Sequence, residues 1–161
     1  MKPVRRRTLL QAAIAAIAGL VTLLVGGPLL AFFADAWRRR QPRQWVKVCD
    51  LAELNSIEPT HFRVVFKLDH LQGGLEEVRG VYAILTDKGP LVFSNVCTHM
   101  HCSVRWLAWR QQITCPCHGG FYDRWGQLIG GPPPFSLPVY ELQVREGEVF
   151  IANAYVARNY L

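Results

Sequence analysis

Two short stretches, Cys97-Thr-His-Met-His-Cys102 and Cys115-Pro-Cys-His-Gly119, hold four of the five cysteines and three of the five histidines in this chain. Cysteine and histidine are the side chains that most often bind iron, zinc and copper in proteins. Each stretch offers one cysteine and one histidine at ligand spacing, as Cys97-x-His99 and Cys115-x-x-His118. The two stretches therefore predict a metal centre, which the rest of the fold must build and hold.

The identity of the metal follows less directly from these residues. Two thiolates and two imidazoles could hold one tetrahedral zinc ion. Zinc would leave Cys102 and Cys117 without a role, one in each stretch. An iron–sulfur centre in which two thiolates hold one iron and two imidazoles hold the other accounts for all four cysteines. We prefer the iron–sulfur interpretation, and zinc stays as the alternative.

The order of residues in both stretches carries a family resemblance. Cys97-Thr-His-x-x-Cys102, followed by Cys115-Pro-Cys-His-Gly-x-x-Tyr-Asp123, resembles the two cluster-binding boxes of Rieske iron–sulfur proteins in cytochrome bc-type complexes. The resemblance extends to the loop Gly131-Pro-Pro-Pro134 and to the apolar N-terminal segment. The cofactor that it implies is a [2Fe-2S] cluster. The implied ligands are Cys97 and Cys115 on the inner iron and His99 and His118 on the outer iron.

The same resemblance implies roles for neighbouring residues. Cys102 and Cys117 would form a disulfide that ties the two boxes together, and His118 would contact the quinol. Tyr122 would donate a hydrogen bond to a ligand thiolate. High-potential family members carry a serine where this chain has Gly120, so the missing hydroxyl implies a lower potential, one that would suit a low-potential quinol such as menaquinol.

Two loops are expected to dock on a partner subunit. The commoner family residues are Leu and Gly where this chain has Met100 and His101. Met100 should still pack on a partner, because methionine is a flexible apolar side chain. His101 is either a tolerated surface histidine or an added hydrogen-bonding group near the cluster. The proline loop contributes Pro132, Pro133 and Pro134. Cys49 is left over, and we interpret it as a free thiol without a ligand role.

An uncharged segment near the N-terminus predicts a membrane anchor. From Leu9 to Ala34 the chain carries no charged residue. A helix of that length measures roughly 39 Å at about 1.5 Å per residue, more than the bilayer core of about 30 Å. A cleaved signal peptide is the alternative, but its apolar region usually has only about 7–15 residues. We expect an uncleaved helix over residues 8–34, in contact with membrane lipid.

The flanks of this segment bear on its orientation. Basic residues lie on both sides, so the positive-inside rule does not decide it. Arg6-Arg7-Thr8-Leu9-Leu10 resembles the twin-arginine export signal, and a disulfide needs an oxidising compartment. We therefore expect a single-pass protein of a bacterial cell membrane with its C-terminal domain on the extracytoplasmic side. The predicted divisions are a cytoplasmic tip (1–7), the anchor (8–34), a linker (35–45) and a Rieske domain (46–161).

Charge excludes one class of partner. Nine of the 18 Lys and Arg residues, but only one of the 12 Asp and Glu residues, lie within residues 1–47. The rest of the chain is therefore slightly acidic and offers no basic face with interleaved aromatic residues. Proteins that bind nucleic acid need such a basic surface. No nucleic-acid partner is expected.

The segment after the linker has the pattern of β structure. Alternating or β-branched runs bounded by turn residues indicate short strands, and Glu146-Gly147-Glu148 indicates a hairpin turn. Gly130–Pro134 should be a loop, because proline cannot donate to a central strand. The fold class expected is an all-β Rieske domain, with small antiparallel sheets and a cluster-binding insertion, plus one N-terminal transmembrane helix. The predicted strands are 61–69, 78–86, 91–96, 139–145 and 149–152.

Three functions compete at this point. The first is an electron-transfer subunit that oxidises quinol at the surface of a cytochrome b-type subunit and passes the electron to a c-type cytochrome. The second is the small Rieske subunit of a molybdenum oxidase such as arsenite oxidase, which would relay electrons without contacting quinol. The third is a soluble ferredoxin of the dioxygenase type. The proline loop and the apolar anchor favour the first function, in which this chain is one subunit of an enzyme and not an enzyme alone.

Overall fold

The computed structural model describes residues 6–38, 43–68 and 75–156. The chain divides into two compact units, Met1–Pro42 and Arg43–Leu161. Parts of the predicted tip, linker and C-terminal end (residues 1–5, 39–42 and 157–161) lie outside the described residues. The division into tip, anchor, linker and domain therefore stays a prediction.

The first unit consists of one long apolar helical segment. Helix α1 (Arg6–Val21) passes through a π-helical turn (Thr22–Gly26) into α2 (Gly27–Arg38). The π turn comes just before Pro28, which has no N–H to continue the regular hydrogen-bond pattern. The segment Arg6–Asp35 contains an 18-residue window with a mean hydropathy of 2.2 and is long and apolar enough to cross a membrane. The helix extends beyond the predicted span of 8–34 at both ends.

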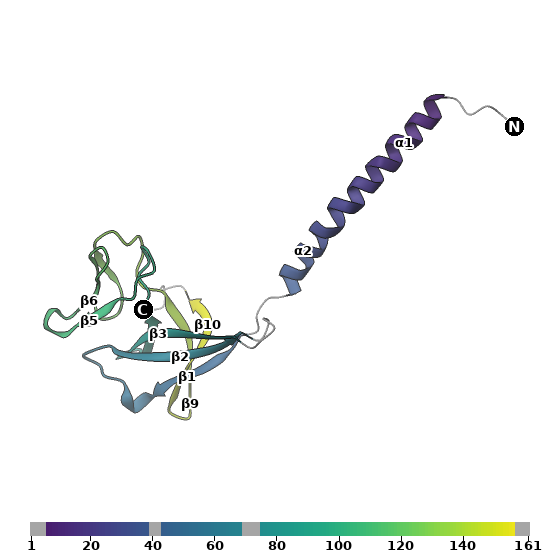
Figure 1. Cartoon of the computed structure of the whole chain (residues 1–161). Coiled ribbons are helices and arrows are strands. Elements are labelled where there is room, and N and C mark those ends of the chain that lie inside the picture. Colours follow the sequence, from purple (N-terminus) through teal and green to yellow (C-terminus); the bar gives the residue numbers. More distant parts are fainter. Residues whose placement is uncertain (1–5, 39–42, 69–74, 157–161) are drawn as a thin grey trace. The chain divides into compact units, whose positions relative to one another are not determined.

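The second unit contains a six-stranded antiparallel sheet (Figure 1). Its strands lie in the order β1-β10-β9-β4-β3-β2, so the first and last strands of the unit pair with each other. Their bounds are β1 (Trp45–Asp50), β2 (Thr60–Leu68), β3 (Leu75–Thr86), β4 (Gly89–Ser94), β9 (Val139–Arg145) and β10 (Glu148–Val156).

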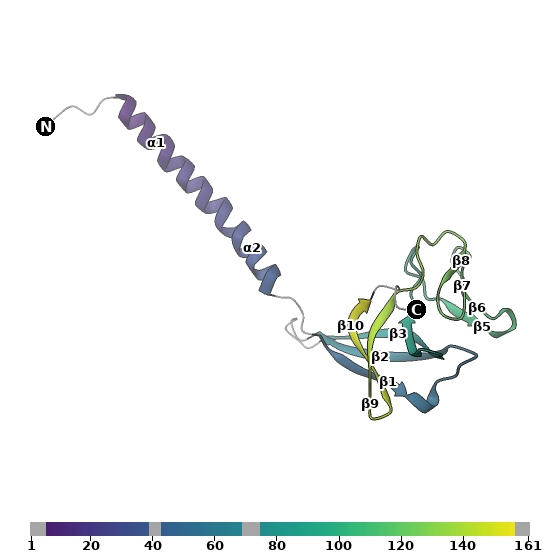
Figure 2. The same cartoon turned by 180° about the vertical axis from the view of Figure 1, so that it is seen from behind.

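A smaller sheet is inserted between β4 and β9. It has four short antiparallel strands in the order β5-β6-β7-β8. Figures 1 and 2 show these strands gathered at one end of the unit, away from the β9–β10 hairpin. Their bounds are β5 (Arg105–Leu107), β6 (Gln112–Cys115), β7 (Gly120–Tyr122) and β8 (Leu128–Gly130). Short 3-10 turns cover Leu51–Glu53 and Ala108–Arg110.

Two hydrophobic cores use opposite faces of the same strands. Successive side chains of a strand point to opposite faces, and β3 and β4 are buried on both. The first core joins the large sheet to the small one and holds Tyr82, Ile84, Leu91, Phe93, Cys97, Val104, Ile113, Cys115, Tyr122, Leu137 and Val139. The second core lies on the other face and holds Cys49, Leu54, Val64, Phe66, Val81, Ala83, Val92, Tyr140, Val149 and Ile151.

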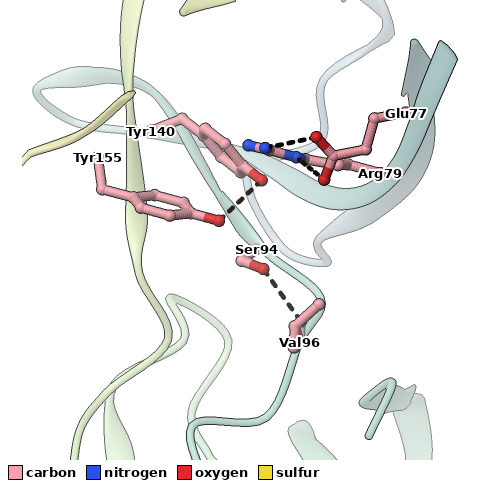
Figure 3. Close-up of polar contacts among 6 residues, drawn as sticks. All are labelled: Glu77, Arg79, Ser94, Val96, Tyr140 and Tyr155. Atoms are coloured by element: carbon pink, nitrogen blue, oxygen red, sulfur yellow. Dashed lines mark hydrogen bonds and ion pairs between the residues drawn. The ribbon is translucent and has the colours of Figure 1, made fainter. Parts of the chain in front are cut away.

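Polar groups at the edge of the second core are paired (Figure 3). Arg79 donates from Nε and Nη2 to the two carboxylate oxygens of Glu77, at 2.7 and 2.8 Å. The hydroxyls of Tyr140 and Tyr155 lie 3.2 Å apart. The buried Ser94 accepts a hydrogen bond from the N–H of Val96 at 3.1 Å, which turns the chain out of β4 toward the first metal-binding stretch.

The all-β fold with an N-terminal apolar helix is confirmed, and the predicted strands correspond to β2, β3, β4, β9 and β10. The pattern did not reveal β1, whose first residue Trp45 fell within the predicted linker, nor the small sheet. Residues 131–134 form a loop as expected, while Gly130 ends the edge strand β8.

Candidate metal centre

The first metal-binding stretch is a tight loop between β4 and β5. The N–H of Cys97 donates to the carbonyl of Cys102 at 2.8 Å, and the N–H of His101 donates to the carbonyl of Cys97 at 3.1 Å. Val96 and Ser103 pair as an isolated bridge just outside these bonds. Residues 97–102 therefore close on themselves, and the loop is anchored on both sides.

The second stretch is the turn of a hairpin. Strand β6 ends at Cys115 and β7 begins at Gly120, and these two residues pair across the hairpin. The N–H of Gly119 donates to the carbonyl of Cys115 at 3.2 Å. Gly119 has φ 69°, which glycine adopts without steric cost. The hairpin therefore presents Cys115 from its stem and His118 from its turn.

A disulfide joins the two loops. Cys102 and Cys117 are bonded, as the resemblance implied, and this prediction is confirmed. Their sulfur atoms and that of Cys115 lie within 4.8 Å of one another. These three cysteines are not a ligand set, because two of them are bonded to each other. Cys115 is left as a free thiol beside the disulfide.

The four predicted ligands come together at the ends of the two loops. Cys97 and Cys115 are free thiols with 1 % and 2 % of their surface exposed. His99 is half-buried and His118 is exposed, and their rings lie edge to face with centroids 4.9 Å apart. Two thiols on the buried side and two imidazoles on the solvent side fit a metal group with mixed ligands.

Backbone and side-chain donors surround the sulfur of Cys97. Burial alone would raise the pKa of this thiol. Hydrogen bonds from the hydroxyl of Tyr122, the N–H of His99, the thiol of Cys115 and the N–H of Met100 outweigh that effect, so the pKa of Cys97 is lowered. Donors aimed at a sulfur atom stabilise its anionic form. The environment of Cys97 is therefore built for a thiolate, the form that binds metal.

Tyr122 connects this thiol to the proline loop. Its hydroxyl lies 3.3 Å from Sγ of Cys97 and 3.3 Å from Oγ1 of Thr98. Thr98 in turn donates to the carbonyl of Phe135 at 2.6 Å. Burial, followed by the contact with Cys97, raises the pKa of Tyr122 to about 12, so its hydroxyl stays protonated and can donate. The role predicted for Tyr122 matches this geometry.

The proline loop packs against the second stretch through residues without side chains. A Cβ at Gly131, which has φ 96°, would collide with the backbone of Gly119. A Cβ at Gly120 would lie 2.5 Å from Cγ and 3.0 Å from Cδ of Pro133. Such distances are below van der Waals contact, so Gly120 leaves the space that the Pro133 ring fills.

The solvent-facing rim around the histidines is apolar. Met100 is 63 % exposed and Phe135 is 72 % exposed, and Pro132 and Pro134 are exposed as well. Pro133 is buried, so a docking role stays a prediction for Pro132 and Pro134 but has no exposed surface to act through at Pro133.

The backbone conformation of His101 explains why relatives more often carry glycine at this position. Its φ is 59°, in the left-handed region that glycine enters freely. Histidine is one of the residues found there more often than most others. The requirement at this position is thus a backbone conformation. His101 itself is exposed.

Sequence reasoning missed two contributors to this site. Thr98 stands inside the motif Cys97-Thr-His99, and its spacing from Phe135 gave no indication of a hydrogen bond between them. The packing of Pro133 on Gly120 was also missed. The available signal was a glycine in place of the usual serine, combined with a proline-rich loop that could fill the space.

Comparison with known families gives a match to the Rieske [2Fe-2S] domain over residues 44–141. The chain is 29% identical over 157 residues to the menaquinol:cytochrome c reductase iron–sulfur subunit of Geobacillus thermodenitrificans, which covers 94% of this chain and 92% of that protein. It is 34% identical over 93 residues to the cytochrome b6-f complex iron–sulfur subunit of a Synechococcus strain. That alignment covers 53% of this chain and about half, 52%, of the relative.

Solved structures are similar at lower levels of identity. A chain of a hyperthermophilic respiratory Complex III is 23% identical with a TM-score of 0.43, covering 82% of this chain and 97% of that chain. The ferredoxin in a complex with the oxygenase of carbazole 1,9a-dioxygenase is also 23% identical, with a TM-score of 0.47, covering 71% and 97%.

Proposed function

The chain belongs to the Rieske [2Fe-2S] family, and from that membership we propose that it is the electron-transfer subunit of a quinol:cytochrome c oxidoreductase-like complex. The observation that carries the proposal is the alignment with a menaquinol:cytochrome c reductase subunit over 94% of this chain. That alignment is long enough to include the apolar N-terminal segment, whereas the family match begins at residue 44. A soluble ferredoxin would have no use for such a segment.

We assign the cluster ligands as the sequence predicted them. Cys97 and Cys115 would hold the inner iron from the buried side, and His99 and His118 would hold the outer iron at the surface. The bound cluster supplies a one-electron acceptor whose potential lies above that of all-cysteine clusters, because neutral imidazoles replace two thiolates. The donors around Cys97 stabilise the thiolate charge.

His118 is the proposed contact for quinol. Its exposed ring can accept or donate a hydrogen bond at the protein surface, while His99 is half-buried beside it. The exposed side chains of Met100 and Phe135 flank this position and would exclude water when a cytochrome b-type subunit covers it. A c-type cytochrome is the proposed electron acceptor.

Menaquinol is the proposed quinol. Gly120 carries no hydroxyl, so the donor found in high-potential relatives is missing here. Pro133 fills the adjacent space, which leaves less room for a water molecule to replace that donor. A lower cluster potential would suit menaquinol, the quinol named for the Geobacillus relative.

The anchor and the disulfide support an extracytoplasmic location for the Rieske unit. The helix over Arg6–Asp35 is long and apolar enough to span a bilayer, and the Cys102–Cys117 bond persists in an oxidising compartment. We place the Rieske unit on the extracytoplasmic side of the cell membrane, anchored by a single pass.

Purification from native membranes tests this function. A tag at the C-terminus of the full chain should retain a b-type haem protein, and the purified complex should reduce a c-type cytochrome with menaquinol. The exchange His118→Ala should abolish that activity. Recovery of a molybdenum-containing partner without b-type haem would reject the proposal in favour of the relay function. A protein recovered alone from the soluble fraction would favour a ferredoxin.

A further inference from the structure

A pocket with two arginines in its lining lies between the large sheet and the small one, outside the metal centre. Its volume is about 440 Å³, within the range of roughly 300–1,000 Å³ that is typical of small-molecule sites. The residues that line it come from β2, β3, the end of β4 and the start of β5. They are His61, Arg63, Val78, Gly80, Tyr82, Asn95, Ser103, Val104 and Arg105.

The floor of the pocket depends on a missing side chain. Gly80 pairs with Arg63 across β3 and β2, and a Cβ at Gly80 would collide with the side-chain amide of Asn95. Gly80 therefore leaves room for the amide. Its nitrogen lies 3.2 Å from Nε2 of His61, and an amide nitrogen can only donate, so the imidazole nitrogen accepts.

Two arginines give the pocket its charge. Arg63 and Arg105 have no carboxylate partner among the residues that the structure describes, and no carboxylate lines the pocket. Arg79 of β3 differs, since Glu77 neutralises it (Figure 3). Residues 48–161 carry more acidic than basic side chains, so two arginines without a carboxylate partner in the described part of the chain are notable.

The charges of both arginines reach the neighbouring pocket residues. Burial and then the charge of Arg63 lower the pKa of His61. Burial raises the pKa of Tyr82, and Arg105 is among the groups that oppose this rise. Both guanidinium groups therefore act on side chains of the same pocket. A second pocket of about 380 Å³, lined partly by Trp125, has one acid and one base, Asp87 and Lys88, and lacks this excess of positive charge.

We propose that the pocket lined by Arg63 and Arg105 binds a phosphate group, either free or on a lipid headgroup. Guanidinium groups match phosphate oxygens through paired N–H donors. The hydroxyl of Ser103 and the second amide hydrogen of Asn95 add two further hydrogen-bond donors. Together with the guanidinium groups they exceed what the two oxygens of a carboxylate could accept, which favours phosphate. The site is independent of the function proposed for the metal centre.

A titration with inorganic phosphate tests the site. The holo full-length protein, labelled with ¹⁵N in neutral detergent micelles, is titrated at pH 7 while chloride is exchanged for phosphate at constant ionic strength. The Asn95 amide and arginine Nε–H signals should shift and saturate. The double exchange R63Q/R105Q should weaken binding at least tenfold, equivalent to about 1.4 kcal/mol.

The matched control is R110Q/R145Q. It removes the same number of charges from two exposed arginines outside the pocket, and its affinity should stay within twofold of the wild type. Equal weakening in both double variants would show general electrostatic attraction and overturn the proposal. So would shifts that fail to saturate. All four exchanges are at exposed positions, and an unchanged visible spectrum of the cluster verifies folding.

A second arm separates the two sources of phosphate. The same titration is repeated in nanodiscs of phosphatidylcholine alone and with added phosphatidic acid. A lipid headgroup in the pocket would compete with free phosphate. The apparent phosphate affinity of the wild type and of R110Q/R145Q, which both keep Arg63 and Arg105, would then be severalfold lower in the acidic discs than in the neutral discs. Equal affinities in both discs would identify free phosphate as the ligand.

Discussion

The surroundings of Cys97 show how single atoms would tune this proposed metal ligand. The hydroxyl of Tyr122 contacts Sγ at 3.3 Å and also bonds to Thr98, so its position is fixed from two sides. A hydrogen bond to a charged group contributes roughly 1.5–3 kcal/mol. Such a contribution favours the cluster when its negative charge is greatest, which is in the reduced state.

Removal of this hydroxyl should lower the cluster potential. In Tyr122→Phe we expect the potential to fall by up to about 65–130 mV, the equivalent of that energy for a one-electron couple. A redox titration of the full chain in detergent measures it. Tyr140→Phe is the control, because it removes an equally buried hydroxyl from the second core. Equal potentials in wild type and Tyr122→Phe would mean that the hydroxyl does not act on the cluster.

Gly120 should be intolerant of any side chain. In Gly120→Ala the new Cβ would overlap the ring of Pro133, and overpacking of this kind costs about 1–3 kcal/mol. The loss should be smaller in a Pro133→Ala background, because the ring is then gone. Guanidinium unfolding of the holo protein measures both.

The control for this pair is Gly130→Ala, since a Cβ there meets nothing within 4 Å. Additive losses from Gly120→Ala and Pro133→Ala would contradict the packing. The same overlap means that Gly120→Ser alone would mix a new hydroxyl with a displaced loop. The effect of the hydroxyl on the potential is best measured with Pro133→Ala already present.

At the scale of strands, the sequence predicted those long enough to show an alternating residue pattern. Strand β9 was found with its bounds because residues 139–145 alternate and a Glu-Gly-Glu turn follows. Even there the burial differs from simple alternation, since Val139 and Tyr140 are both buried in different cores while Val144 is exposed. A strand between two cores loses its polar face.

The small sheet could not be predicted in the same way. Strands β5, β7 and β8 have three residues each, too few for a periodicity to emerge. Each of them pairs only with strands next to it in the sequence, and the disulfide joins loop residues outside these strands. The ligand motif could be found because cysteine and histidine at ligand spacing are visible in the sequence itself. The packing of Pro133 on Gly120 depends on tertiary structure and is not.

The Glu77–Arg79 pair on β3 should make a small pH-dependent contribution to stability. The hydrogen bonds from Arg79 lower the pKa of Glu77. A carboxyl with a lowered folded pKa stabilises above its unfolded pKa, and this stabilisation is lost as pH falls through the folded value. Both side chains are partly exposed, so we expect about 1 kcal/mol or less.

Urea unfolding of Glu77→Gln against the wild type measures this contribution. The difference should be present at pH 7 and should disappear as the pH is lowered below about 4. Glu146→Gln, in the exposed β9–β10 turn, serves as the control. A difference that persists unchanged at low pH would assign the effect to packing on Phe66 instead of charge.

For the whole molecule, the apolar helix and the metal-binding unit place different demands on biosynthesis. The helix must enter a membrane, while the metal-binding unit needs both iron and a disulfide. Export after folding would reconcile these demands, since iron would be inserted in the cytoplasm and Cys102–Cys117 would oxidise outside. The twin-arginine resemblance at Arg6-Arg7 agrees with that order.

Replacement of both arginines by lysine tests this route. Arg6→Lys with Arg7→Lys keeps the charge beside the helix, so the balance of basic residues on either side is unchanged. In this double variant we expect the C-terminal unit to stay inaccessible to protease added to spheroplasts. In the wild type the protease should digest it. Arg5→Lys should behave as the wild type. Normal exposure in the double variant would exclude the twin-arginine route.

The two cores described above share strands β3 and β4, with neighbouring residues such as Leu91 and Val92 assigned to opposite sides. Neither core can open while the other keeps those strands in place, so the unit should melt cooperatively as one body. The two proposed cysteine ligands, Cys97 and Cys115, belong to the first core and should unfold with it. We therefore expect iron to be retained until the entire unit unfolds, so that its release would report global denaturation.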